Sequence, residues 1–161
     1  SAILFANLSM AVNLDSIHQA NINKYLGLLH GKDSANYQSS MYFNNAIRLY
    51  KVLKFEPGLH VTYFDIAQVR YLQIDYVTCQ DYLTKSTNFW RTKNVQQRVF
   101  VNNILGIRLG IATDNVKSAR QCISENEQMI NQHTTLPQAN LDTFYRYKYL
   151  FDEKFQGVRL D

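Results

Sequence analysis

The stretch NINKYLGLLHGKD, residues 21–33, is the part of the sequence that decides the fold class. Its apolar residues recur at helical spacing through Ile22, Leu26 and Leu29, and Gly31 followed by a charged pair ends the run. A second stretch, NILGIRLGIATDN at 103–115, repeats the order Leu-Gly-aliphatic and also ends in polar residues. Both stretches predict helices that end in a polar turn.

The composition extends this prediction to the whole chain. The 161 residues are 46% hydrophobic and 13% aromatic, which is typical of one packed globular domain. Only two prolines and six glycines are present to interrupt regular structure, so the elements should be long. Apolar residues at alternating three- and four-residue spacing indicate helices, and we expect an all-α fold.

Five helices are expected, and together they predict an elongated antiparallel bundle that forms a single domain, 1–161. They cover about 2–30 and 34–54, a stretch from about 59 without a clear end, a stretch that ends near 130, and about 138–158. Two alternatives stay open for the third stretch: it turns near Lys93-Asn94 or runs straight through. A sixth helix would require turns near Lys93-Asn94 and at Thr113-Asp114-Asn115. The continuous seam Leu109, Ala112, Val116 and Ala119 argues against the second of these turns.

The two Leu-Gly stretches also indicate an internal duplication. The interval from Gly27 to Gly110 is nearly the same as the interval from Pro57 to Pro137. Helical sequences imitate one another easily, so two interpretations stay open. The chain contains either two similar stacked modules, with halves 1–92 and 93–161, or one bundle without internal symmetry.

Motifs of catalysis and metal binding are absent from the sequence. It contains no phosphate-binding glycine loop, no dinucleotide fingerprint and no HExxH. The histidines are isolated, and the two cysteines form no CxxC pair. The net charge of +4 is spread without a dense basic run, unlike that of most nucleic-acid-binding domains. We therefore expect no enzyme activity, no metal, no cofactor and no nucleic-acid partner.

Several cationic or amide residues interrupt the apolar seams. They are Arg98, Asn102, Arg108, Arg70 and Lys148. A guanidinium carried toward a bundle interior must be paired or liganded, and it can grip a carboxylate with two hydrogen bonds. These five residues are the candidate ligand-binding residues. The alternative is that they pair with nearby aspartates or extend to solvent along their apolar stems.

The chain resembles the extracytoplasmic all-helical sensor domains of bacterial chemoreceptors and sensor histidine kinases, particularly the helical bimodular type. The segments that carry the resemblance are LGLLHGKDSANY (26–37), LGIATDNVKSA (109–119) and LDTFYRYKYLFDEKF (141–155). The resemblance implies a small ligand, often an organic acid, held between helices. It also implies a homodimer on the periplasmic side of the inner membrane, attached through flanking spans that this chain does not contain.

One feature departs from that family. A domain inserted between two membrane spans needs both termini at one end, hence an even number of helices, whereas five are expected. The competing hypothesis is a helical scaffold for protein–protein interaction, such as a secretion-associated domain. A sensor should have a pocket lined by Arg98, Asn102 and Arg108, whereas a scaffold should bind another protein.

Overall fold

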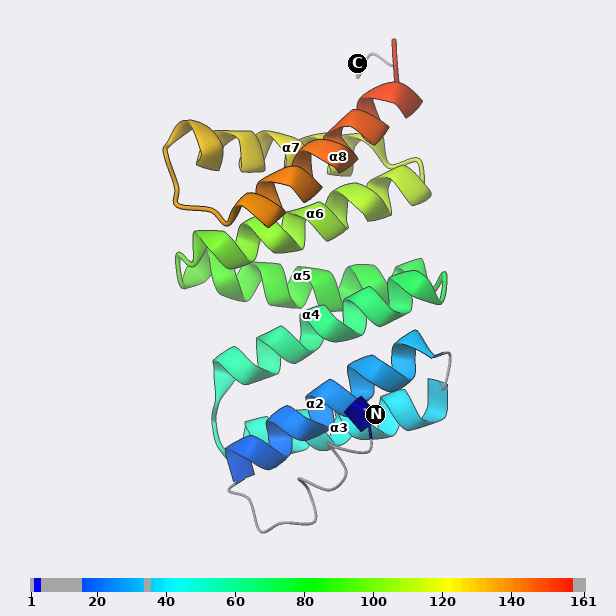
Figure 1. Ribbon diagram of the computed structural model, residues 1–161, viewed down its shortest axis with the longest axis vertical. Helices are drawn as coiled ribbons and strands as arrows, with labels where there is room; N and C mark the ends of the chain where they lie inside the picture. The colour runs from blue at the N-terminus through cyan, green and yellow to red at the C-terminus, as the bar shows by residue number, and fades with distance from the viewer. Residues whose placement is uncertain (1, 4–15, 34–35, 158–161) are drawn as a thin grey trace. The chain divides into compact units, whose positions relative to one another are not determined.

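Seven helices make up nearly all of the chain that the computed structural model describes, which is residues 2–3, 16–33 and 36–157 (Figure 1). The all-α prediction is therefore confirmed, and the expected number of five helices is wrong. The apolar opening segment and the first half of the helix expected over 2–30 lie largely outside the described residues. The chain divides into two compact units, Ser1–Tyr82 and Leu83–Asp161.

The first unit contains α2 (Ser16–Lys32), α3 (Asn36–Val52), α4 (Glu56–Leu72) and the start of α5 (Tyr76–Thr92). α2 and α3 pack along their lengths as an antiparallel hairpin, and α4 packs on both of them. Pro57 lies in the first turn of α4, where its missing N–H costs nothing, so it begins this helix. Phe43, Ile66 and Val69 form part of the core where α3 and α4 meet.

The second unit contains the rest of α5, then α6 (Gln96–Ala112), α7 (Val116–Asn131) and α8 (Gln138–Lys154). α6 packs against both α7 and α8 and is the most buried helix of the unit. Leu109 and Ile123, expected to face the core, are only 3% and 6% exposed. Phe144 of α8 packs its ring edge-on against Phe100 of α6. The apolar seam that contains Leu109 and Ile123 is therefore a core face.

The five turns from α3 to α8 share one backbone geometry. Each contains a non-glycine residue with positive φ, and these residues are Lys54, Ile74, Asn94, Asp114 and His133. The next residue donates its N–H to a carbonyl five residues earlier, as in Val95 to Trp90 at 3.0 Å and Asn115 to Gly110 at 2.9 Å. This is the 6→1 hydrogen bond of a Schellman motif, which ends a helix abruptly.

Two of these turns correct the sequence interpretation. The helix expected from residue 59 onward breaks at 73–75, and the seam expected to continue through 113–115 breaks there too. Each following helix has a side-chain cap: Asp75 accepts from the N–H of Thr78, and Asn115 accepts from the N–H of Ser118. The Thr78 hydrogen bonds lower the pKa of the Asp75 carboxyl, because they stabilise its charged form. The turn near Lys93-Asn94 is present as the six-helix alternative required.

The turns recur at a fixed interval along the chain. The first residues of α2 to α7 are equally spaced, and they are Ser16, Asn36, Glu56, Tyr76, Gln96 and Val116. Two consecutive helices with their turns therefore occupy about 40 residues, which lies within the range of about 34 to 47 residues found for two-helix repeats. The chain thus has the periodicity of a helical-hairpin repeat.

Close helix packing at glycines shows which residues of the two hairpins correspond. A Cβ on Gly27 would lie 2.7 Å from the ring of Phe43, and one on Gly106 would lie 2.8 Å from Cys122 Sγ. The two pairs have the same separation along the chain, and Gly106 follows Gly27 by the same interval as Gly110 follows Gly31. The pairing of Gly27 with Gly110 expected from the sequence is thus wrong by about one helical turn. Gly31 also lies inside α2 and does not end it.

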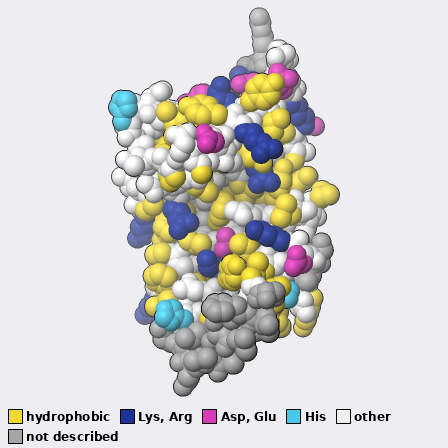
Figure 2. All heavy atoms as spheres, in the orientation of Figure 1, with side chains coloured by type: hydrophobic (Ala, Val, Ile, Leu, Met, Phe, Trp, Pro, Cys, Tyr) yellow, Lys and Arg dark blue, Asp and Glu magenta, His cyan; other side chains and the backbone are white. Residues whose placement is uncertain are grey.

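No helix of the described residues is both long enough and apolar enough to cross a bilayer. On the face drawn in Figure 2, the described Lys and Arg side chains lie in separate small groups among hydrophobic and uncharged ones. The absence of a nucleic-acid partner stays a prediction.

Candidate functional site

The five residues predicted to bind a ligand belong to two units, Arg70 to the first and the other four to the second. Arg70 belongs to the first unit, where its guanidinium donates to Gln73 at 3.0 Å and to Ser40 at 3.3 Å. Lys148, in the second unit, lies 3.3 Å from Asp152 and 3.6 Å from Glu127. Its hydrogen bond with Asp152 raises the pKa of the ammonium. The charge of Lys148 is therefore balanced within the protein.

The two arginines of α6 lie over aromatic rings. The guanidinium of Arg98 is 5.7 Å from the ring centre of Trp90, and that of Arg108 is 5.2 Å from the ring centre of Tyr147. These are cation–π distances. Aspartate partners or solvent exposure were the alternatives expected for these arginines from the sequence. Their aromatic partners were missed because the rings lie on other helices.

Asn102 supports packing between α5 and α6. It is 2% exposed, and its carboxamide lies 3.0 Å from Ser86 Oγ and 3.1 Å from the carbonyl oxygen of Arg98. Because a carbonyl can only accept, the amide nitrogen faces Arg98 and the amide oxygen faces Ser86. Asn23, at the corresponding position of the first hairpin, donates in the same way to the carbonyl of Gln19, one turn back in its helix. Both are buried structural amides.

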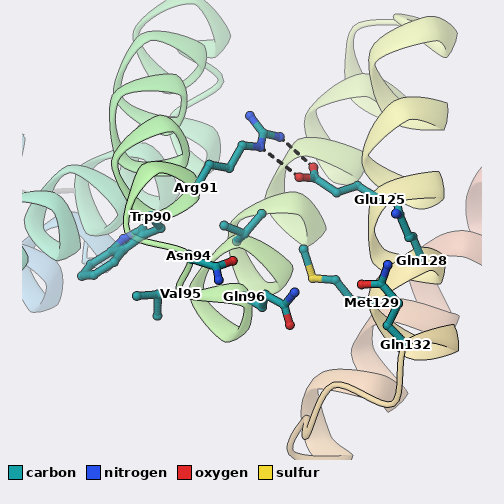
Figure 3. A pocket seen from close by; sticks show the side chains of 10 residues that line it. Trp90, Arg91, Asn94, Val95, Gln96, Glu125, Gln128, Met129 and Gln132 are labelled. Atoms are coloured by element: carbon teal, nitrogen blue, oxygen red, sulfur yellow. Dashed lines mark hydrogen bonds and ion pairs between the residues drawn. The ribbon is translucent and has the colours of Figure 1, made fainter.

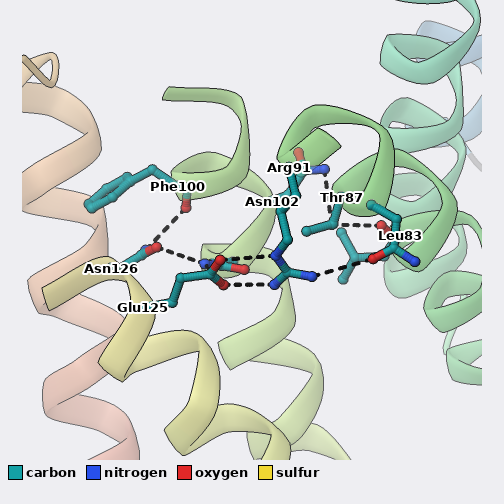
Figure 4. A network of polar contacts seen from close by, with 9 residues as sticks. Leu83, Thr87, Arg91, Phe100, Asn102, Glu125 and Asn126 are labelled. Carbon is teal, nitrogen blue, oxygen red and sulfur yellow. Dashed lines mark hydrogen bonds and ion pairs between the residues drawn. The ribbon is translucent and has the colours of Figure 1, made fainter. Parts of the chain in front are cut away.

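A second polar network joins α5, α6 and α7 beside Asn102 (Figure 4). Arg91 grips Glu125 with two hydrogen bonds of 2.9 and 2.7 Å. Asn103 donates to Glu125 at 2.8 Å and to Asn126 at 2.9 Å, and Asn126 donates to the Phe100 carbonyl. Arg91 holds the pKa of the Glu125 carboxyl below its usual range, and Glu125 raises the pKa of Arg91. Both groups are therefore charged at neutral pH and neutralise each other.

Neither thiol is placed to act as a nucleophile. Burial raises the pKa of Cys122 to about 11, which leaves very little thiolate at neutral pH, and Cys79 is fully buried. His30 stacks on Tyr42, and His60 packs edge-on against Tyr63. Within the described residues, no group of three or more His, Cys, Asp or Glu side chains could hold a metal ion.

A cavity of about 190 Å³ opens where the α5–α6 turn meets the last two turns of α7 (Figure 3). Its apolar lining comes from the buried side chains of Trp90, Val99 and Met129 and from the exposed Val95. The Arg91–Glu125 ion pair closes one side of it. The cavity lies entirely within the second unit.

Four carboxamides surround this apolar lining: Asn94, Gln96, Gln128 and Gln132. Figure 3 shows Asn94 and Gln96 approaching from the α5–α6 turn and Gln128 and Gln132 from α7. Gln96 accepts from the Thr134 hydroxyl at 2.8 Å, which holds the loop after α7 against α6. The side chains of Asn94, Gln128 and Gln132 make no hydrogen bond to another described residue.

A second, larger hollow of about 430 Å³ lies between α7 and α8 and includes Lys148. Arg98, Asn102 and Arg108 line neither hollow. The amide cavity was not predicted from the sequence, because its walls, at 90–99 and 125–132, come together only through the turn at 113–115. The spacing of Asn94, Gln128 and Gln132 carries no motif that would have revealed it.

Comparison with protein-family models, with curated proteins and with solved structures gives no match for this chain.

Proposed function

We propose that the chain is a non-catalytic scaffold that binds other proteins through repeated helical hairpins. The observation that carries the proposal is the repeated hairpin core, in which Leu26-Gly27 and Leu105-Gly106 occupy corresponding positions. Arrays of two-helix repeats present extended surfaces to protein partners, and their repeats are not built for chemistry.

The residue spacing within the first hairpin supports the same class. Tetratricopeptide repeats place Leu-Gly on the first helix, an aromatic residue three positions after the glycine, and a small residue four positions before an aromatic residue on the second. The first hairpin has Leu26-Gly27, His30 and Ser39 followed by Phe43 at these positions. Both hairpins have Asn, at 23 and 102, where those repeats have Trp. This is an analogy of pattern, and it favours a protein-binding function.

The sensor hypothesis has less support from the geometry. It needs a pocket between helices with cationic groups free to hold a carboxylate. The Arg98 and Arg108 guanidinium groups lie over aromatic rings, the Lys148 ammonium is paired, and Asn102 is used within the core. The homodimer, the periplasmic location and the absence of catalysis stay predictions from the sequence.

Two parallel measurements on the full chain separate the two functions. In the first, the chain is screened against displayed protein fragments from its source organism, and bound fragments are measured as purified proteins. In the second, thermal unfolding is followed with a panel of small organic acids. A scaffold should bind a purified fragment saturably and respond to no acid. A saturable thermal shift with an acid, lost in Arg98→Ala or Arg108→Ala, together with no binding fragment, would establish the sensor instead.

A further inference from the structure

We infer that the cavity between the α5–α6 turn and α7 binds an uncharged stretch of peptide, with one apolar side chain inserted and the flanking peptide groups held by carboxamides. This inference rests on the proposed function and specifies the chemistry of the partner.

The size of the cavity favours one side chain over a whole small molecule. Pockets that enclose small-molecule ligands usually measure about 300–1,000 Å³, whereas this cavity measures about 190 Å³. It is also open to solvent on one side, where Gln128 and Gln132 are exposed. A chain passing across the opening could therefore insert one residue and continue in both directions.

The charge of the lining selects an uncharged occupant. Among the described residues that line the cavity, the only ionised groups are Arg91 and Glu125, which satisfy each other through two hydrogen bonds. Binding an acid or an ammonium group would require this pair to open, which leaves one charge without its partner. An apolar side chain against Trp90, Val99 and Met129 meets no such cost.

The amide rim matches the peptide backbone. A carboxamide has N–H donors and a carbonyl acceptor, as a peptide group does, so Asn and Gln side chains can pair with backbone groups of any sequence. Asn94, Gln128 and Gln132 lie around the opening and are not engaged with other described residues. They supply hydrogen bonds on both sides of the inserted residue.

The surroundings of Trp90 argue against a carbohydrate, the other ligand that amides and tryptophan commonly bind. Sugar recognition uses an open aromatic face, whereas Trp90 is 7% exposed. Arg98 lies over this ring, and Phe89 packs edge-on against it with 4.8 Å between ring centres. Trp90 therefore serves as the wall of the cavity.

The test uses the full 15N-labelled chain and a capped pentapeptide, Ac-Ser-Gly-Leu-Gly-Ser-NH2, with versions that carry Lys or Glu in the centre. Binding is followed through the indole N–H of Trp90, the single tryptophan, and through the side-chain amide signals of Asn and Gln. A single anchor predicts a Kd on the order of 1 mM for the leucine peptide, which NMR titration measures. The Lys and Glu peptides should bind at least tenfold more weakly.

The variant Gln128→Ala/Gln132→Ala should weaken binding of the leucine peptide roughly tenfold through the loss of two hydrogen bonds. The matched control is Gln121→Ala, on an exposed position of α7 away from the cavity, and it should leave the Kd unchanged. Unchanged binding in the double variant, absence of saturable shifts, or tighter binding of a charged peptide would each overturn the inference. So would shifts of the same signals by methyl glucoside but not by the peptide. A protein fragment that binds equally to wild type and double variant would leave the proposed function standing and remove only the cavity.

Discussion

Gly106→Ala tests the close approach of α6 and α7, because its effect on the free energy of unfolding should change sign when the Cys122 sulfur is removed. An added Cβ would lie 2.8 Å from Cys122 Sγ, while the next nearest atoms are 3.9 and 4.0 Å away, at ordinary contact distance. One sulfur atom therefore causes the whole clash. Overpacking of this kind costs about 1–3 kcal/mol, and replacing a helical glycine by alanine returns about 1 kcal/mol. We expect Gly106→Ala to lower the free energy of unfolding by up to about 2 kcal/mol.

In a Cys122→Ala background the same substitution should stabilise the protein. The sulfur is absent, the new methyl meets the Cβ at position 122 and Leu83 Cδ2 at ordinary contact distance, and the gain in helix propensity of about 1 kcal/mol remains. The double-mutant cycle should thus give a coupling of about 1–3 kcal/mol between the two positions. Urea unfolding followed by far-UV circular dichroism measures the four variants, and Trp90 fluorescence reports the second unit.

Gly110→Ala is the matched control, because its Cβ would meet the Ala119 Cβ at 2.6 Å and the Asn115 carbonyl oxygen at 3.0 Å. Neither the Ala119 Cβ nor the Asn115 carbonyl oxygen can move away by a side-chain rotation. Gly110→Ala should therefore be destabilised equally in both backgrounds. The reasoning is refuted if Gly106→Ala has the same effect, within about 0.5 kcal/mol, with and without the cysteine sulfur.

Four further substitutions test a turn, the ion pair and the core. Ile74→Gly should raise the free energy of unfolding by about 1 kcal/mol, because a β-branched residue at φ 61° is strained and its side chain is 73% exposed; a drop in Tm would contradict the strain. Glu125→Gln should be less stable than wild type at neutral pH. Because the folded-state pKa of Glu125 is depressed, wild type loses this advantage as the pH falls below the usual carboxyl range and through that pKa; urea midpoints should converge there, and a constant gap would exclude the linkage. Leu109→Ala and Ile123→Ala should each cost about 2–5 kcal/mol in urea unfolding as core truncations, and losses below about 0.5 kcal/mol would place them at the surface.

The sequence was sufficient to predict helices and their buried faces, because apolar spacing follows directly from the helical period. It was insufficient to locate the turns at 73–75 and 113–115. Their positive-φ residues are Ile74 and Asp114, in place of the glycine that usually marks such a turn. The seam through Leu109 and Ala119 continues in phase across the second turn, since both residues are buried on the two arms of the hairpin. The caps at Asp75 and Asn115 were the local signals that could have located both breaks.

The predicted site failed for a related reason. Cationic residues were correctly placed beside apolar seams, but the partners of Arg98 and Arg108 are rings on other helices, which no local pattern identifies. The amide cavity depends on α6 and α7 being separate helices, so an interpretation that joined them could not bring Asn94 near Gln132. The candidate site is therefore formed by residues that lie far apart in the sequence. Their contacts depend on the turn at 113–115.

The closure of the first hairpin over short sequence distances sets the order in which the chain can fold during synthesis. Ser39 donates to the Gly27 carbonyl, and Phe43 fills the space above that glycine, so both contacts lie within one stretch of the chain. Helical hairpins with such local contacts form in microseconds to milliseconds, whereas translation adds about 5–20 residues per second. The 54 residues from Val52 to Gly106 take about 3–11 s to be made. The α2–α3 hairpin thus has time to close before the ribosome reaches Gly106. Gly27 is then already packed against Phe43 when Gly106 is made, so the two similar hairpins do not compete for each other's helices.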